Sequence, residues 1–294
     1  MVTRCALIWR WSKRVLRIAL AVYILLTIVL ASLQTSLIFP GAASQGQKHA
    51  IVRPSSDEEL LHLPTPTGEH VAAVFGRALK AGPGREIRDD ASDRPTVIFF
   101  YGNGMCMADC MGEFLRLRRD GFNVIVPEFL GYGMSSGKPG EPGVYAAADA
   151  AYDYLLSRND INRNKIVVFG WSLGAAAAID LASRKPVAAI MTISAFTSMA
   201  DMARGLLPFL PTSLMLRHHF ENERKLREID LPVFIGHGRR DEIVPYRMSD
   251  QLAKAAKGPV TRITIDDGGH NDVFEVGGEQ LEQAIALFIE RFAK

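Results

Sequence analysis

The stretch KIVVFGWSLGAAAA, at residues 165–178, decides the fold of this chain. The apolar run at its start predicts a buried strand, and the alanine-rich run at its end predicts a helix. Between them lies GWSLG at residues 170–174, a G-x-S-x-G pattern whose sharp turn exposes a serine at the end of a strand. The two glycines leave room for the strand and the helix to cross, and the helix N-terminus presents free N–H groups to a developing oxyanion. We therefore predict that Ser172 is a nucleophile and that the N–H of Leu173 is an oxyanion donor.

Short apolar runs alternate with helical stretches from about Ser55 to the C-terminus. Strands are predicted at residues 71–78, 96–101, 123–127, 165–170, 188–193, 233–237 and 260–265. Helices are predicted at residues 108–119, 144–157, 173–184, 248–257 and 279–292. This alternation is typical of an α/β domain with a mostly parallel sheet and helices on both faces. We expect one such domain at residues 55–294, with its site beyond the carboxyl ends of the strands.

A serine nucleophile needs a histidine base and a carboxylate that orients the base. His270 lies in a glycine-rich loop after the last predicted strand, and it is the expected base. Asp241 follows the strand at residues 233–237 by a short turn, and it is the expected acid, whereas its neighbour Glu242 would point elsewhere. The order Ser172, Asp241, His270 is the order that this strand–turn–helix pattern requires. The other histidines downstream of the serine are expected at the surface or in support of neighbouring loops, and these are His218, His219 and His237.

A second oxyanion donor is expected from the loop after an early strand. The sequence YGNG at residues 101–104 follows the predicted strand TVIFF, and the N–H of Asn103 is the expected donor. A second glycine-rich stretch, GYGMSSGK at residues 131–138, superficially resembles a phosphate-binding loop. Tyr132 occupies the place of the first required glycine, and Pro139 occupies the place of the hydroxyl residue that holds magnesium. We therefore predict no nucleotide site.

The composition is that of an ordinary globular protein. The chain has 294 residues, 48% of them hydrophobic and 22% charged, with a formal net charge of +2, which favours no nucleic-acid partner. Cys106 and Cys110 are expected to be buried thiols, with a disulfide between them as the alternative. The histidines and cysteines do not have the spacing of a zinc site, and we predict neither a metal nor a cofactor. The composition predicts no particular oligomeric state.

The N-terminal segment combines a basic start with a long uncharged run. Residues 1–17 contain five basic side chains, and the next charged residue is Lys48. Residues 18–39 are long and apolar enough to cross a bilayer, and residues 40–54 are expected to be a linker. The charge asymmetry predicts a cytoplasmic N-terminus and an extracytoplasmic catalytic domain, either periplasmic or lumenal. The alternative is a signal peptide cleaved after the small residues at 41–43.

The interval at residues 195–230 is expected to be a small helical insertion that lies over the site like a cap. Its scattered apolar residues indicate an acyl chain or a lipid-like ligand, and the membrane anchor would hold the site near the bilayer.

With these features together, the sequence resembles the α/β-hydrolase family. The matching stretches are FFYGNGM, GYGMSSGKPGEPGVYAAADAAYDYL, GWSLGAA, HGRRDEIVP and GGHND, between about Thr96 and Asn271. Within the family, the sequence is most similar to the prolyl-aminopeptidase-like branch of small esterases and thioesterases with one N-terminal membrane span. Two positions depart from the family pattern: Tyr101 replaces a histidine, and Arg239 replaces an acidic or polar residue.

The resemblance implies an α/β-hydrolase fold, a triad of Ser172, Asp241 and His270, and oxyanion donors at Asn103 and Leu173. The expected activity is hydrolysis of a carboxylic ester or thioester, such as a small acyl ester or a lipid-like substrate, through an acyl-enzyme. Two alternatives remain open. One is a serine peptidase or aminopeptidase, and the other is a non-catalytic, membrane-tethered binding protein on a hydrolase scaffold.

Overall fold

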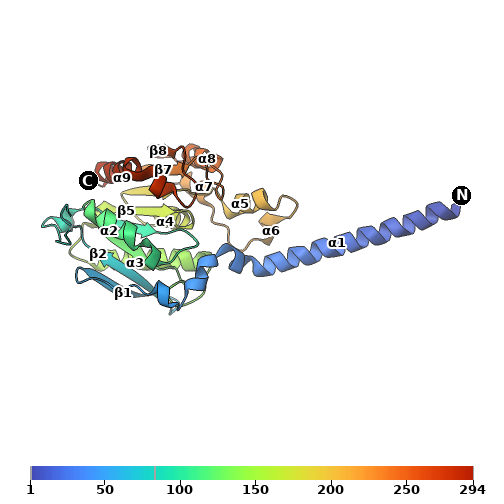
Figure 1. Cartoon of the computed structure of the whole chain (residues 1–294), viewed down its shortest axis with the longest axis horizontal. Helices are drawn as coiled ribbons and strands as arrows, with labels where there is room; N and C mark the ends of the chain where they lie inside the picture. Colours follow the sequence, from blue (N-terminus) through green and yellow to red (C-terminus); the bar gives the residue numbers. More distant parts are fainter. Residues whose placement is uncertain (1, 83, 294) are drawn as a thin grey trace.

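The computed structural model describes residues 2–82 and 84–293, without the side chains of residues 2–8 (Figure 1). An eight-stranded sheet forms the centre of this described part, in the order β1-β2-β4-β3-β5-β6-β7-β8. The strands are Glu58–Pro64 (β1), His70–Gly76 (β2), Thr96–Phe100 (β3), Asn123–Pro127 (β4), Ile166–Trp171 (β5), Ala189–Ile193 (β6), Val233–Gly238 (β7) and Val260–Ile265 (β8). Six neighbouring strands, from β4 to β8, are parallel, whereas β2 runs antiparallel to both β1 and β4. The predicted mostly parallel α/β sheet is confirmed.

Strand β1 is absent from the sequence prediction. It contains two glutamates and ends at a proline, so it has no regular alternation of apolar and polar residues. Only Leu63 in it is buried. An edge strand needs a partner on one side only, and charged residues and proline are common there because they discourage pairing with other chains. The pairing of β1 with β2 therefore depends on tertiary contact rather than on a local pattern.

Helices cover both faces of the sheet, as expected. One face carries Met111–Arg119 (α2) and Val273–Phe292 (α9), which an ion pair between Arg116 and Glu282 joins at 3.7 Å. The other face carries Glu141–Ser157 (α3), Leu173–Arg184 (α4) and Arg247–Ala255 (α8). Short 3₁₀ turns lie at Pro40–Ser44 (η1), Lys48–Ala50 (η2), Ala91–Asp93 (η3), Met107–Cys110 (η4) and Arg163–Lys165 (η5). Helix α9 begins six residues before the predicted start and breaks at Gly278, which has φ of 45°.

The interval at residues 195–230 contains Met199–Leu206 (α5), Thr212–Met215 (α6) and Asn222–Leu226 (α7). We call it the cap. Its α5 and α6 extend from the sheet domain toward the N-terminal helix (Figure 1). The cap is helical, as predicted.

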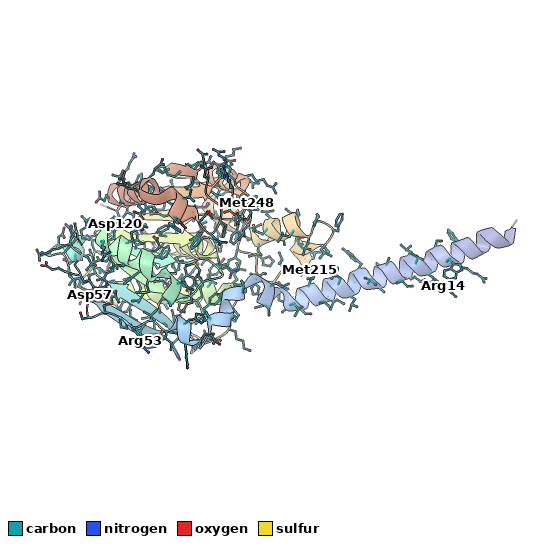
Figure 2. All side chains as sticks on the ribbon, viewed as in Figure 1. Arg14, Arg53, Asp57, Asp120, Met215 and Met248 are labelled. Carbon is teal, nitrogen blue, oxygen red and sulfur yellow. The ribbon has the colours of Figure 1, made fainter. Side chains whose placement is uncertain are left out.

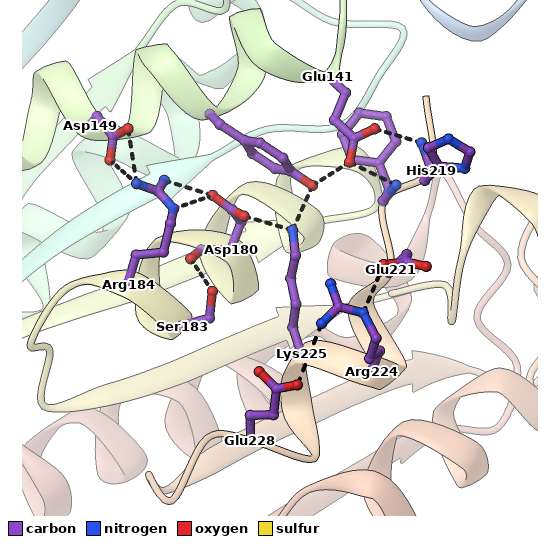
Figure 3. A network of polar contacts seen from close by, with 12 residues as sticks. Glu141, Asp149, Asp180, Ser183, Arg184, His219, Glu221, Arg224, Lys225 and Glu228 are labelled. Carbon is purple, nitrogen blue, oxygen red and sulfur yellow. Dashed lines mark hydrogen bonds and ion pairs between the residues drawn. The ribbon is translucent and has the colours of Figure 1, made fainter. Parts of the chain in front are cut away.

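A network of polar contacts attaches the far end of the cap to the nucleophile helix (Figure 3). Glu141, at the start of α3, accepts a hydrogen bond from the backbone N–H of His219 at 2.5 Å. The hydroxyl of Tyr145 donates to the same carboxylate at 2.7 Å and accepts from Lys225 at 2.9 Å. Lys225 also donates to Asp180 on α4 at 2.6 Å. Because Lys225 lies on α7, these contacts connect the cap to both α3 and α4.

The N-terminal helix, Val2–Ile38 (α1), projects away from the sheet domain (Figure 1). Among the described residues it contains one segment, Trp9–Ile38, that is long and apolar enough to cross a membrane. The most apolar window of that segment has a mean hydropathy of 2.4, and none of it is buried inside the protein. A membrane anchor and a signal sequence both fit these properties.

The C-terminal end of α1 and the segment after it pack against the rest of the chain. The side chain of Gln34 donates to the carbonyl of Met215 at 3.0 Å and accepts from the N–H of Arg217 at 2.7 Å. Figure 2 places Met215 at this junction. Phe39, directly after α1, is only 1% exposed, and residues 40–54, which we expected to be a linker, include the buried Val52.

Candidate active site

Ser172 lies at the turn between β5 and α4, where the sequence predicted it. Its φ of 54° and ψ of −114° are unusual for a residue with a side chain, and such strain persists only where surrounding contacts enforce it. Here the N–H of Ser172 donates to the carbonyl of Ile193 on β6 at 2.9 Å, so the neighbouring strand holds the turn. The serine is 8% exposed and lies in the wall of a cavity.

The two glycines of the turn are required because there is no room for a side chain at either position. A Cβ on Gly170 would collide with the backbone of Gly174, and a Cβ on Gly174 would collide with the carbonyl of Phe100 on β3. The strand, the helix and the neighbouring strand therefore cross at a distance that only glycine allows. Leu173 is the first residue of α4, so its N–H belongs to the first helical turn, which has no partner within the helix.

His270 connects Ser172 to Asp241. Its Nε2 lies 3.0 Å from the Oγ of Ser172, and its Nδ1 lies 2.8 Å from Oδ2 of Asp241. All three side chains are largely buried, although 98 residues separate the histidine from the serine and 29 separate it from the aspartate. The three residues that the sequence selected are thus brought into one hydrogen-bonded chain at the carboxyl edge of the sheet.

The loop after β7 holds Asp241 in position. Its Oδ1 accepts hydrogen bonds from the backbone N–H groups of Ile243, at 3.0 Å, and Val244, at 2.6 Å. Burial alone would raise the pKa of Asp241. Hydrogen bonds from His237, His270 and the backbone outweigh burial and lower that pKa well below its ordinary value of 3.8. Asp241 is therefore a carboxylate at neutral pH, able to orient a histidine.

The other histidines have different surroundings. His237 is buried, and its Nε2 donates to the carbonyl of Val244 at 2.9 Å while lying 3.3 Å from Asp241, so it supports the acid loop as expected. His218 is also buried, between α1 and α3. Its Nδ1 accepts from the N–H of Glu141 at 3.2 Å, so its Nε2 carries the proton and donates to the hydroxyl of Thr35 at 3.0 Å. His219 is exposed.

Asn103 lies in the loop after β3, with Ser172 and Leu173 in the walls of one cavity. The side chain of Asn103 is held from both ends. Its amide nitrogen donates to the carbonyl of Ile38, and its amide oxygen accepts from the hydroxyl of Tyr132 at 2.8 Å. The backbone carbonyl of Asn103 accepts from the N–H of Gly41 at 3.2 Å. The expected oxyanion loop is therefore held by the last residue of α1, by Gly41 after it and by Tyr132.

Sequence reasoning missed Glu128, which holds the same loop by hydrogen bonds. Its fully buried carboxylate accepts from the hydroxyl of Tyr101 and from the N–H groups of Met107, at 3.0 Å, and Met134, at 3.3 Å. Burial is the main cause of the raised pKa of Glu128, and the hydrogen bonds act in the opposite direction. Tyr101 replaces the histidine expected at this position, and its hydroxyl links the loops after β3 and β4. The available signal was a glutamate directly after a buried strand.

Arg239, the second departure from the family pattern, lies at the surface. Its Nε is 2.6 Å from the carboxylate of Asp266, but both side chains are more than half exposed, and such pairs contribute little to stability.

Cys106 and Cys110 are free, buried thiols, as predicted, so the alternative of a disulfide is wrong. Burial raises the pKa of the Cys106 thiol to about 11. Among the described residues no cluster of three metal-ligating side chains is found.

A cavity of about 750 Å³ opens above Ser172 and His270. Its walls come from three parts of the chain that are far apart in sequence: the end of α1, the cap, and the loops that carry the polar residues. From α1 come Leu30, Ala31, Gln34, Leu37 and Ile38; from the cap come Phe196, Met199, Met202, Ala203, Leu206, Leu207, Leu210, Thr212, Met215 and Leu216. The lining is mostly apolar and contains no aspartate or glutamate among the described residues. Residues of the cap therefore line the same cavity as Ser172 and His270.

Comparisons with known proteins agree with this architecture. The alpha/beta hydrolase fold family model matches residues 95–216. The chain is 35% identical over 228 residues to the uncharacterised protein Rv2307c of Mycobacterium tuberculosis, a match that covers 78% of this chain and 81% of that protein. It is 34% identical over 219 residues to the alpha/beta hydrolase domain-containing protein WAV2 of Arabidopsis thaliana, with 68% of this chain and 71% of that protein covered.

Among solved structures, the Pyrococcus furiosus esterase PF2001 has a similar fold. The TM-score is 0.68 at 20% sequence identity, and the alignment covers 83% of this chain and 96% of the esterase. At that identity the likeness concerns the fold alone. The sequence matches, the eight-stranded sheet and the strand–serine–helix turn together lead to one conclusion: this chain belongs to the α/β-hydrolase family.

Proposed function

We propose that this protein is a serine hydrolase that cleaves carboxylic esters or thioesters with apolar acyl groups. The observation that carries the proposal is the position of His270, which contacts the hydroxyl of Ser172 with one ring nitrogen and the carboxylate of Asp241 with the other. This arrangement matches the geometry of an activated serine, in which the histidine takes the hydroxyl proton and the carboxylate orients the ring.

The reaction follows from the roles of these groups. Ser172 attacks the acyl carbon while Nε2 of His270 takes its proton, and the N–H groups of Asn103 and Leu173 stabilise the oxyanion of the tetrahedral intermediate. His270 then gives the proton to the leaving alcohol or thiol, which leaves an acyl group on the serine. A water molecule, activated by the same histidine, releases the acid and restores the free hydroxyl.

The cavity supports an ester or thioester rather than a peptide substrate. An aminopeptidase needs an acidic group to hold the substrate amine, and the described lining contains no carboxylate. An apolar cavity of this size suits an alkyl chain. The predicted likeness to the prolyl-aminopeptidase-like branch therefore extends, in our proposal, to its esterases and thioesterases.

We also propose that the N-terminal segment is retained as a membrane anchor, with a cytoplasmic N-terminus. The residues just before a cleavage site after Ala43 are packed into the structure: Ile38 and Gly41 hydrogen-bond to Asn103, and Phe39 is buried. Cleavage would remove these contacts and one wall of the cavity. The intact mass of the protein from a membrane fraction tests this point, and a mass that begins at residue 44 would contradict it.

The catalytic proposal is tested with Ser172→Ala and p-nitrophenyl esters of increasing chain length, alongside acyl-CoA and peptide substrates. The wild-type protein should hydrolyse the esters and react with a fluorophosphonate probe, and the variant should do neither. Ser183→Ala is the matched control, because Ser183 is exposed at the other end of the same helix. An active Ser172→Ala variant, or a wild-type protein that the probe does not label, would reject both the nucleophile and the proposed reaction.

A further inference from the structure

The cap contains an uncharged apolar turn with two highly exposed side chains, Phe209 and Leu214, that do not line the cavity. Between Arg204 and Arg217 lie twelve residues without charge, GLLPFLPTSLML. Within them Leu206 is 77% exposed, Phe209 is 88% exposed and Leu214 is 87% exposed. We call residues 205–216 the cap turn. A soluble domain rarely keeps several large apolar side chains together in water, so such a surface marks an interaction site.

The cap turn lies against the apolar N-terminal helix. The hydroxyl of Tyr23 on α1 donates to the carbonyl of Phe209 at 3.0 Å, and Gln34 contacts Met215 eleven residues further along α1. Figure 1 shows α5 and α6 beside the part of α1 that is nearest to the sheet domain, and Figure 2 places Arg14 far from this junction. Tyr23 belongs to the uncharged part of α1. A bilayer that surrounds that part of the helix therefore also reaches the cap turn.

The backbone of the cap turn satisfies many of its own polar groups, as a segment in hydrocarbon must. The carbonyl of Leu207 accepts from the N–H of Leu210 at 3.1 Å, and the carbonyl of Leu210 accepts from the N–H of Thr212 at 2.8 Å. The carbonyl of Pro211 accepts from the N–H of Leu214 at 3.0 Å. The two prolines have no N–H to satisfy, and Tyr23 supplies a donor to Phe209 from outside the turn.

We propose that the cap turn is a second membrane contact, and that acyl substrates enter the cavity from the bilayer between α1 and the cap. The cavity is lined by Leu206, Leu207 and Leu210 of the turn on one side and by α1 on the other, so its walls continue the two surfaces that face lipid. Arg204 and Arg217 flank the turn, where their charged ends reach the headgroup region. The substrate route rests on the ester hydrolysis proposed above, whereas the membrane contact does not.

Phe209 and Leu214 allow the contact to be tested apart from catalysis. Both are among the most exposed side chains of the turn, and neither lines the cavity. For a direct measurement, the full chain carrying Cys5→Ser and Phe209→Cys is labelled with an environment-sensitive fluorophore and reconstituted into phosphatidylcholine vesicles. The remaining cysteines, Cys106 and Cys110, are buried. The matched control carries the label at Leu287→Cys, which is 66% exposed on α9.

Lipids with a nitroxide on the acyl chain should quench the label at position 209 at least fivefold more than the label at position 287. Equal quenching at both positions would overturn the proposal. A label at position 209 that is shielded from water but insensitive to the nitroxide would also overturn it, because it would indicate a second copy of the chain rather than lipid.

The substrate route is tested with the double variant Phe209→Glu, Leu214→Glu in the same vesicles. We expect hydrolysis of a short, water-soluble p-nitrophenyl ester to stay within twofold of wild type, and hydrolysis of a long-chain ester in the bilayer to fall at least tenfold. Leu287→Glu should change neither. If both activities of the double variant equal those of wild type, entry from the bilayer is wrong. If the wild-type protein hydrolyses neither ester, the proposed function fails, and the quenching result still decides the membrane contact.

Discussion

Replacement of Asp241 by asparagine keeps the size and shape of the side chain but replaces its carboxylate with a neutral amide. The wild-type Oδ1 accepts two backbone N–H groups, from Ile243 and Val244, so the amide oxygen of the asparagine must occupy that place. The amide nitrogen then takes the place of Oδ2, 2.8 Å from Nδ1 of His270 and 3.3 Å from Nε2 of His237. It donates to Nδ1 of His270, which moves the ring proton to Nε2. That nitrogen can then no longer accept the proton of the serine.

The opposite orientation of the asparagine amide is energetically unfavourable. It would place an NH₂ group against two backbone N–H donors, and each buried donor left without an acceptor costs about 1–3 kcal/mol. The wrong tautomer of His270 is therefore the stable one. Loss of the correct tautomer in a serine triad costs about 10⁴ in kcat. We expect the same magnitude here, which corresponds to about 5.5 kcal/mol in the activation barrier.

The assay is hydrolysis of a p-nitrophenyl ester by the full chain in vesicles, with kcat and KM measured separately. Asp241→Asn should lower kcat and leave KM close to wild type, because the substituent is similar in size. Glu242→Gln is the matched control: it removes the same charge from the next residue, whose side chain is exposed, and should keep wild-type kcat. A folded Asp241→Asn variant within tenfold of wild-type kcat would refute the reasoning, as would an equal loss in the control.

Buried polar groups offer three more tests, each read from urea denaturation. Tyr101→Phe removes the hydroxyl that donates to the buried Glu128 and should lower the free energy of unfolding by about 1–3 kcal/mol; an unchanged stability would show that this hydroxyl is dispensable. Arg118 is fully buried, with Nη2 2.7 Å from Oδ2 of Asp57, so Arg118→Ala should cost about 3 kcal/mol; a loss below about 1 kcal/mol would contradict a buried pair. Because the folded protein lowers the pKa of Asp241, its ionised form stabilises the fold at pH values above 3.8, and this stabilisation is lost as the pH falls toward the lowered pKa. The difference in stability between wild type and Asp241→Asn should therefore be constant from pH 8 to about pH 5 and shrink below about pH 4; a difference that grows on acidification would mean that the sign is wrong.

The core of the fold could be predicted from local patterns. Buried parallel strands are short apolar runs, so all six strands from β3 to β8 were predicted to within one residue at each end. The carboxyl ends of parallel strands lie at one edge of the sheet, which is why residues that follow β5, β7 and β8 could be expected to meet. Edge strand β1 could not be predicted, because an element with one partner and little burial carries no strong apolar pattern.

The candidate site also combines residues that the sequence predicted with contacts that only the tertiary structure decides. The sequence by itself determined Ser172, Asp241 and His270 as candidates, because each is set by its distance from a strand of its own. Only the tertiary structure decided how the loops around them are supported and what surrounds the substrate. Glu128 and Tyr101 meet across 27 residues, and Gln34 meets Met215 across 181. Contacts at such separations depend on where whole elements pack, and no local pattern records that. The cavity above the serine, with one wall from α1 and one from the cap, exists only once those two segments have folded against each other.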